Sequence, residues 1–210
     1  MRYPHVIFDF DGTLADSFAE GVAIFQRIGP SLGLKEVDPA LAKTLPTRQF
    51  MKALGVSLWR LPKVVRAFQE AAAETAHNLH LFEGIADILS RLHADGVSLG
   101  ILSSNLEETI RICLRANGVE QLFAFVIGSP KLFGKARVLR RICRQRQIDR
   151  DQLLYVGDES RDVVAAIKAK VAIAAVSWGF QGEALLRDSG ATIVLQSPAE
   201  LIDIVRGELR

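Results

Sequence analysis

Cysteine is scarce in this chain of 210 residues, which contains only Cys113 and Cys143. With no CxxC pair and no cysteine framework, both are expected to be small buried hydrophobic side chains in a reducing compartment. No window approaches the roughly 18 apolar residues that a membrane span requires. The N-terminus also lacks a basic region followed by a long apolar run, which a secretory signal would need. A cytoplasmic location is therefore expected, and a membrane is not expected as a partner.

A strong excess of either charge is also missing. Lysine and arginine total 26 against 24 aspartate and glutamate residues, which gives a formal net charge of +2. This near-balance argues against binding to a nucleic acid polymer or to a membrane surface. The arginines between Arg137 and Arg150 are locally basic, and on a helix they are expected to form a solvated face. Since 49% of the residues are hydrophobic, a globular protein is expected.

Short aliphatic runs alternate along the chain with amphipathic segments of helical length. This alternation predicts an α/β fold with a doubly wound, mainly parallel sheet and helices on both faces. Strands are expected at residues 6–8, 97–102, 123–127, 153–156, 172–176 and 192–195, and helices between the later strands at residues 85–93, 107–116, 136–146 and 161–169.

One interval breaks the alternation, because far more residues separate the first two strands than a single crossover helix needs. Its apolar spacing predicts helices but no strand, with breaks at Gly-Leu, Leu-Pro and Gly-Val pairs. Residues 16–82 are therefore predicted to form a small helical domain inserted into a catalytic core made of residues 1–15 and 83–210. The helices of the insertion are expected at residues 17–29, 39–44, 48–54 and 62–79.

Acidic residues follow two of the predicted strands directly. The first strand ends in Asp-Phe-Asp-Gly-Thr at residues 9–13, and the fourth ends in Gly-Asp-Glu-Ser-Arg-Asp at residues 157–162. Alternate side chains of an extended backbone share a side, so Asp9 and Asp11 can face one pocket. In an open α/β sheet, sites form beyond the carboxyl ends of strands where the strand order reverses. If these two strands are neighbours, Asp158 joins Asp9 and Asp11, and the crowded carboxylates require a hard cation such as Mg²⁺.

Each acidic cluster alone has a plainer interpretation, since aspartates commonly cap helices and form turns. For residues 158–162 taken singly, this interpretation is nearly as good as a metal site. Two such clusters, each directly after an apolar strand, make the plain interpretation poor. The conjunction therefore favours a magnesium site.

Polar groups suited to an anion follow two further strands. Ser103 can donate a hydroxyl hydrogen bond to a phosphoryl oxygen, with Ser104 and Asn105 beside it, and Lys135 can supply a mobile positive charge. Taken singly, a Ser-Ser-Asn run is more often a helix N-cap, and a lysine such as Lys135 is more often an exposed side chain. Lys131 is a rival for the lysine role, and Lys135 is preferred because a glycine precedes it and a helix follows it.

These four groups, in this order, resemble the motifs of the haloacid dehalogenase superfamily of phosphatases over essentially the whole chain. Residues 9–13 match its DxDGT pattern, Ser103 the second motif, Lys135 the third and residues 157–162 the acidic fourth. The insertion at residues 16–82 resembles the helical cap domain of the phosphoglycolate-phosphatase-like type. One departure is Lys170, which stands where relatives commonly have glycine before the next strand.

The resemblance implies catalytic roles for the first motif. Asp9 is expected to attack phosphorus and form an aspartyl-phosphate, and Asp11 to protonate the leaving alcohol and then deprotonate the attacking water. A carboxylate oxygen of Asp9, the main-chain carbonyl of Asp11 and the side chain of Asp158 are expected to hold Mg²⁺. An aspartate two positions after the nucleophile favours phosphoryl transfer over dehalogenation, because a leaving alkoxide needs a proton.

The other motif residues are implied to bind the substrate or to orient catalytic groups. Ser103 and Lys135 are expected to hold the equatorial phosphoryl oxygens. Glu159 and Asp162 are expected to orient a metal-bound water or Lys135. The further substrate-binding candidates are Thr13, Ser104, Asn105 and, in the insertion, Arg48.

Arg48 resembles a substrate-contacting position of some capped relatives, and an exposed helical arginine is an equally good interpretation. A small phosphorylated metabolite is the expected partner, and phosphoglycolate, a sugar phosphate or a nucleotide would all suit these residues. Two alternatives stay open from the sequence. One is a sugar phosphomutase of the same superfamily, and the other is a non-catalytic relative that binds phosphate.

Overall fold

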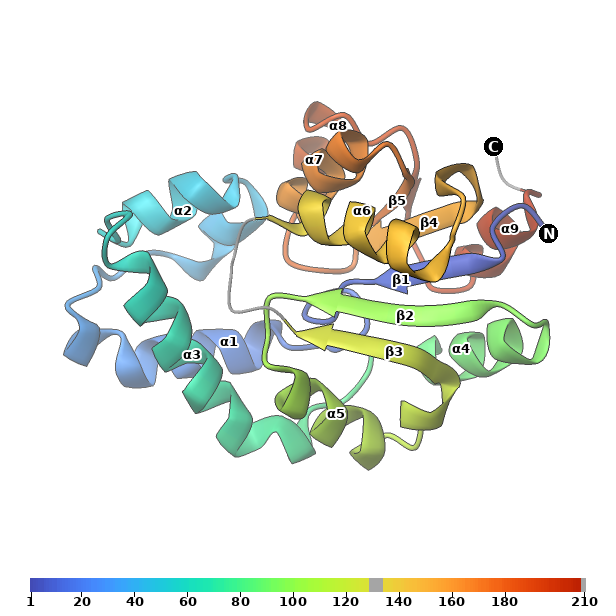
Figure 1. Ribbon diagram of the computed structural model, residues 1–210. Coiled ribbons are helices and arrows are strands. Elements are labelled where there is room, and N and C mark those ends of the chain that lie inside the picture. The colour runs from blue at the N-terminus through green and yellow to red at the C-terminus, as the bar shows by residue number, and fades with distance from the viewer. Residues whose placement is uncertain (129–133, 209–210) are drawn as a thin grey trace.

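A computed structural model describes residues 1–128 and 134–208, and its centre is a parallel sheet of six strands. The strands lie in the order β3-β2-β1-β4-β5-β6, so the chain runs outward from β1 first to one side and then to the other (Figure 1). The predicted doubly wound α/β fold is confirmed. The strands are β1 (His5–Phe8), β2 (Ser98–Ser103), β3 (Phe123–Gly128), β4 (Leu153–Gly157), β5 (Ala172–Val176) and β6 (Val194–Leu195).

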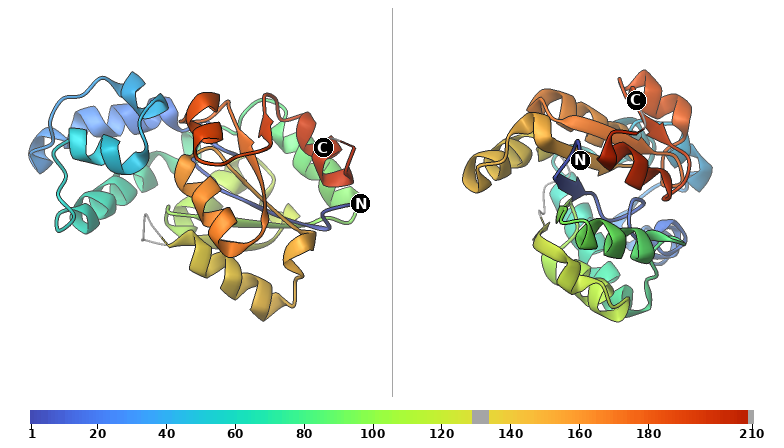
Figure 2. Two further views of the ribbon diagram at one scale, coloured as in Figure 1. Left: turned by 90° about the horizontal axis from the view of Figure 1, so that it is seen from above. Right: turned by 90° about the vertical axis from the view of Figure 1, so that its right-hand side faces the viewer.

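Both faces of the sheet are covered by helices (Figures 1 and 2). Successive side chains of β1 point to opposite faces of the sheet. Val6 and Phe8 pack into one buried cluster and Ile7 into the other, which is why the strand is apolar throughout. Burying each such side chain stabilises the fold by about 1.5–3 kcal/mol. The first cluster is covered by α4 (Ile85–Ala94), α5 (Glu107–Ala116) and α9 (Glu200–Arg206), and the second by α6 (Lys135–Arg146), α7 (Ser160–Ala169) and α8 (Glu183–Asp188).

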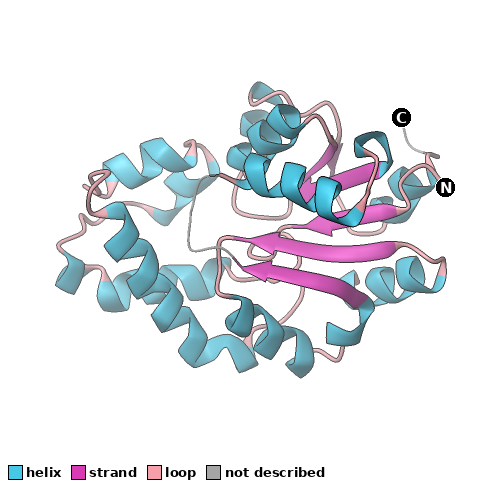
Figure 3. Ribbon diagram, viewed as in Figure 1, coloured by secondary structure: helices cyan, strands magenta, loops and turns pink. Residues whose placement is uncertain are grey.

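The long interval between β1 and β2 is helical, as predicted, and lies beyond the carboxyl ends of the strands (Figures 1 and 3). It has a small core of its own around Leu54, Val56 and Val64. The segment predicted as a helix at residues 39–44 is a 3₁₀ helix, which Asp38 caps by accepting a hydrogen bond from the main-chain nitrogen of Ala40. The α-helices of the insertion are α1 (Phe18–Ile28), α2 (Thr47–Ala53) and α3 (Leu61–Thr75).

The two short helices α8 and α9 were not predicted. They span six and seven residues, too short for a helical period to stand out. Tertiary packing stabilises them instead, through buried side chains such as Leu186 in α8 and Leu201 in α9.

Two expectations from composition concern burial and the membrane. Cys113 and Cys143 are both buried and free, so the prediction of small buried thiols is confirmed. Within residues 1–128 and 134–208, no helix is long and apolar enough to cross a membrane.

Lys170 adopts the left-handed backbone conformation that glycine prefers. It ends α7 with φ 59° and ψ 49°, and its main-chain nitrogen donates to the carbonyl of Ala166. We expect Lys170→Gly to raise the free energy of unfolding by about 0.5–1 kcal/mol. The free-energy cost of holding lysine in the left-handed conformation exceeds the entropic cost of ordering the more flexible glycine on folding. Lys168→Gly, inside the same helix, should lower it by about 1 kcal/mol. Urea titration followed by circular dichroism measures both, and a loss of stability in Lys170→Gly would contradict the account.

Candidate active site

The segment after β1 turns sharply and brings its carboxylates to the end of the sheet. The main-chain nitrogen of Asp9 donates to the carbonyl of Val156 in the neighbouring β4, at 2.8 Å. Gly12 then turns the chain with φ +73°, and a Cβ on this residue would lie 2.2 Å from an oxygen of Asp158. Glycine is therefore required here both for its conformation and for the close approach of the two loops.

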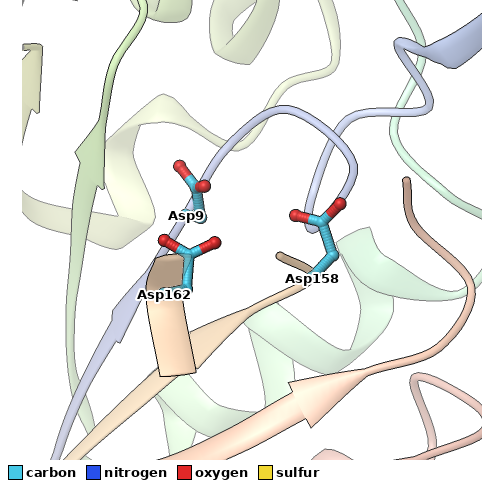
Figure 4. Close-up of side chains that lie close together, drawn as sticks. All are labelled: Asp9, Asp158 and Asp162. Carbon is cyan, nitrogen blue, oxygen red and sulfur yellow. The ribbon is translucent and has the colours of Figure 1, made fainter. Parts of the chain in front are cut away.

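Three buried carboxylates meet where β1 and β4 end (Figure 4). One side-chain oxygen each of Asp9, Asp158 and Asp162 lies within 4.8 Å of the others. Asp158 is held in place by the hydroxyl of Thr13, which donates at 2.9 Å, and by the main-chain nitrogen of Phe180 at 2.8 Å. The neighbouring strands thus bring Asp9 and Asp158 together as the sequence predicted.

Lys135 bridges two of these three carboxylates. Its Nζ atom is 2.5 Å from Oδ2 of Asp9 and 2.6 Å from Oδ1 of Asp162. The hydroxyl of Tyr155 also donates to Oδ1 of Asp162, at 3.1 Å. Burial alone would raise the pKa of Asp162, but the charges of Lys135 and Arg161 outweigh it and lower that pKa. Asp162 therefore acts as the counter-ion that positions Lys135.

The other two carboxylates of the cluster are less well compensated. Burial raises the pKa of Asp9 to about 7, although Lys135 opposes this shift, and burial together with Glu159 raises the pKa of Asp158 well above its usual range. Hard oxygen donors whose charges are costly to bury fit a divalent cation, which would offset that cost. Asp9 and Asp158 thus fit Mg²⁺, the metal expected from the sequence. The main-chain carbonyl of Asp11 stays a predicted third ligand.

Asp11 is not one of these three carboxylates and has its own hydrogen-bond partner. The amide of Asn105 donates to Oδ2 of Asp11 at 3.2 Å. Burial is the main cause that raises the pKa of Asp11, with Asn105 among the groups that oppose it. Ser103 is buried at the end of β2 and accepts from the main-chain nitrogen of Asn105 at 3.1 Å, so its own hydroxyl proton can be donated elsewhere. The loop after β2 thus supports both Asp11 and the predicted phosphate-binding hydroxyl.

A polar network joins the helical insertion to the strand ends. Thr47 of α2 donates to Glu159 at 2.6 Å, and Arg161 donates to the same carboxylate at 2.9 Å through Nε. Arg161 also donates to the hydroxyl of Ser104 at 3.3 Å, and Gln69 of α3 donates to the Ser104 carbonyl at 2.6 Å. Both contacting helices of the insertion are therefore tied to loops that carry predicted site residues.

Several of these residues were not identified from the sequence. Arg161 had a visible signal, since it is the one positive charge inside the acidic run at residues 157–162. Thr47 and Gln69 gave none, because their contacts depend on how the insertion packs against the core. Tyr155 was taken only as a strand residue.

The structure gives other predicted residues partners inside the protein. Thr13 contacts Asp158, and Glu159 contacts Thr47 and Arg161. Arg48 is exposed on α2, and its role in specificity stays a prediction. Lys131, the rival of Lys135, lies outside the described residues, while Lys135 meets Asp9 directly.

The fold and the site together define an α/β protein with a buried, cation-compatible carboxylate cluster at the point where the strand order reverses. A family model described as haloacid dehalogenase-like hydrolase matches residues 6–176. A phosphoglycolate phosphatase of Synechococcus elongatus is 33% identical over 208 residues, which cover 98% of each chain. The tyrosine-protein kinase PtkA of Mycobacterium tuberculosis is 30% identical over 205 residues, or 95% of this chain and 70% of that one.

A solved structure extends the similarity to three dimensions. The crystal structure of a predicted phosphatase from Clostridium acetobutylicum matches all of this chain and all of its own, with a TM-score of 0.84 and 25% identity. The chain belongs to the haloacid dehalogenase-like hydrolases. It is an enzyme of the phosphoglycolate-phosphatase-like type, which confirms the resemblance stated from its motifs.

Proposed function

We propose that this protein is a Mg²⁺-dependent phosphatase that hydrolyses a small phosphomonoester through an aspartyl-phosphate on Asp9. The observation that carries the proposal is the position of Asp9, which is buried, 2.5 Å from the Nζ atom of Lys135 and in the same carboxylate cluster as Asp158. A nucleophilic carboxylate beside a cation is suited to attack an anionic phosphate.

The residues around Asp9 account for each bond change of the reaction. An oxygen of Asp9 bonds to phosphorus while the ester bond to the alcohol breaks, and Asp11 gives its proton to the leaving oxygen. Asp11, now a carboxylate, takes a proton from a water molecule whose oxygen attacks phosphorus and releases inorganic phosphate from Asp9. Burial raises the pKa of Asp11, which favours the protonated form that the first step needs.

Two groups are placed to stabilise the phosphoryl oxygens. Lys135 is fixed by Asp162 and can move its charge between Asp9 and the phosphoryl group, and Ser103 supplies a hydroxyl from the end of β2. Mg²⁺ held by Asp9 and Asp158 would neutralise negative charge on the nucleophile and the substrate. The helical insertion serves as a cap, because Thr47 and Gln69 close it onto the loops beside the site.

Magnesium binding can be measured without turnover. We expect millimolar Mg²⁺ to raise the melting temperature of the wild-type protein, since a ligand that binds only the folded state stabilises it, by about 2.7 kcal/mol at one hundred times its Kd. Asp158→Asn should abolish this shift and the Mg²⁺-dependent release of phosphate. Asp151→Asn, on a 3₁₀ turn before β4, is the control and should keep both. An equal shift in Asp158→Asn would contradict the assignment of the metal site.

The substrate panel should contain phosphoglycolate, sugar phosphates and nucleoside monophosphates, ranked by kcat/KM for release of free phosphate. A mutase would pass the phosphoryl group to a second hydroxyl and yield an isomeric sugar phosphate. Free phosphate without such an isomer supports the phosphatase. Failure of the Mg²⁺-loaded protein to release phosphate from any ester would favour a binding protein instead.

A further inference from the structure

A cavity of about 310 Å³ opens between the helical insertion and the strand ends. Its polar lining includes Asp11 and Asn105 at the site, together with Ser104 and Arg161 beside it. Pockets that bind small molecules begin at about 300 Å³. The cavity is therefore large enough for an organic group and is continuous with the proposed catalytic residues.

Asp11 fixes which part of the substrate this cavity receives. A proton donor must lie within hydrogen-bond reach of the leaving oxygen. Asp9 is buried beneath the cavity and does not line it, whereas Asp11 does. In the proposed reaction the phosphoryl group would therefore lie toward Asp9, and the alcohol part of the ester would extend past Asp11 into the cavity.

The walls of the cavity are mainly apolar and come from the three helices of the insertion. Some of their aromatic and aliphatic side chains are only partly buried, and these can contact a ligand as well as the core of the insertion. They include Phe25, Met51, Val65 and Phe68.

The charged side chains of the lining have polar partners within the protein. Thr75 donates to Glu20 at 2.7 Å, and Thr47 and Arg161 both donate to Glu159. The charge of Arg161 is thus balanced by a carboxylate at the same end of the cavity. A second anion would have to compete with Glu159 for Arg161, while an apolar group would leave these bonds in place.

We propose, on the basis of the phosphatase function above, that the substrate is a phosphomonoester whose alcohol carries an apolar alkyl or aryl group. Such a group buries apolar surface against the insertion, which binds it in the orientation that Asp11 requires. A two-carbon acid such as glycolate would leave most of the cavity unfilled and would place its carboxylate against apolar walls.

Gly21 offers a way to change the cavity without touching the site. It lies inside α1, lines the cavity, and has no atom within 4 Å of the position that a Cβ would take. Gly21→Leu should therefore fill the cavity without a clash of its Cβ and raise the helical propensity of α1. Ala23→Leu, on the exposed side of the same helix, is the matched control.

The test measures phosphate release from ethyl, butyl and hexyl phosphate and from phosphoglycolate, with Mg²⁺. We expect kcat/KM to rise by up to about fourfold per added methylene. The value of kcat/KM for hexyl phosphate should exceed the value for phosphoglycolate. Gly21→Leu should lower kcat/KM for hexyl phosphate by about tenfold or more and leave ethyl phosphate nearly unchanged. Ala23→Leu should leave the whole series unchanged.

The outcomes separate this inference from the phosphatase assignment. A flat alkyl series, or a clear preference for phosphoglycolate, would overturn the apolar substrate while leaving a phosphatase. No phosphate release from any ester would overturn the function itself. Melting temperatures report whether each variant folds. If Gly21→Leu does not fold, Ala72→Leu takes its place, since Ala72 lines the cavity from α3. If Ala23→Leu lowers kcat/KM for hexyl phosphate as much as Gly21→Leu does, the alkyl group does not bind in the cavity.

Discussion

Replacing Asp9 with asparagine is expected to lower kcat by at least about 10⁴-fold, because an amide oxygen is a poor nucleophile toward phosphorus. Asp9 is 1% exposed and adjoins the cation of Lys135. The loss should appear in kcat with every phosphate ester, since no other carboxylate in the described cluster has the same position at the end of β1. Steady-state phosphate release in Mg²⁺ measures it.

The fold should survive this change. Burial raises the pKa of Asp9 to about 7, so the ionised carboxylate is costly to bury without a metal, and Lys135 keeps its partner Asp162 in the variant. The melting temperature of metal-free Asp9→Asn should therefore equal or exceed that of the wild type. Asp16→Asn, an exposed change in the same loop, is the control and should keep full activity. Substantial turnover in Asp9→Asn would refute its role as the nucleophile.

Replacing Lys135 with methionine should produce the largest loss of stability. The substitution removes the cation that lies 2.5 Å from Asp9 and 2.6 Å from Asp162, and it leaves two buried carboxylates without that partner. Breaking a buried ion pair in this way typically costs about 3–5 kcal/mol. Urea titration of the metal-free protein near pH 7 measures the cost. Lys168→Met, an exposed change in the same α/β core, should cost little.

The loss in Lys135→Met should depend on pH in a defined direction. In the wild type the pKa of Asp162 is lowered, so its stabilising contribution is present above the unfolded value of 3.8 and is lost as pH falls. Without Lys135, both Asp162 and Asp9 lose the cation that most strongly opposes the effect of burial, so the pKa of each is expected to rise, and stability is then lost as pH rises above about 4. The difference in the free energy of unfolding between Lys135→Met and the wild type should therefore grow from pH 4 to pH 7. A difference that shrinks over this range would show that the ion pair is not its cause.

The sequence predicted the sheet because its strands carry two independent signals. Each main strand is a short aliphatic run, and four of them end in polar residues suited to one site. Asp9 and Asp158 could be placed together once their strands were taken as neighbours, and the structure pairs Phe8 with Val156. Parallel strands present their carboxyl ends at one edge, so local motifs were enough to predict that these two carboxylates meet.

The contacts of the insertion could not be predicted in the same way. Thr47 binds Glu159, although the sequence drew attention to its neighbour Arg48, because the angle at which α2 meets the core is set by packing and not by a motif. Glu159 likewise has the charge of a metal-site residue but bonds to the insertion and to Arg161. The short helices α8 and α9 were missed for a related reason, since buried contacts and not periodicity stabilise them.

The most direct test of the account is to trap the phosphoryl group during turnover. Wild-type protein mixed with Mg²⁺ and a substrate from the panel is quenched in acid, digested and examined by mass spectrometry. We expect one phosphoryl group on the peptide that contains Asp9, and none when Asp9→Asn is treated in the same way. A phosphoryl group on another residue, or active turnover with no phosphorylated peptide at any quench time, would contradict it.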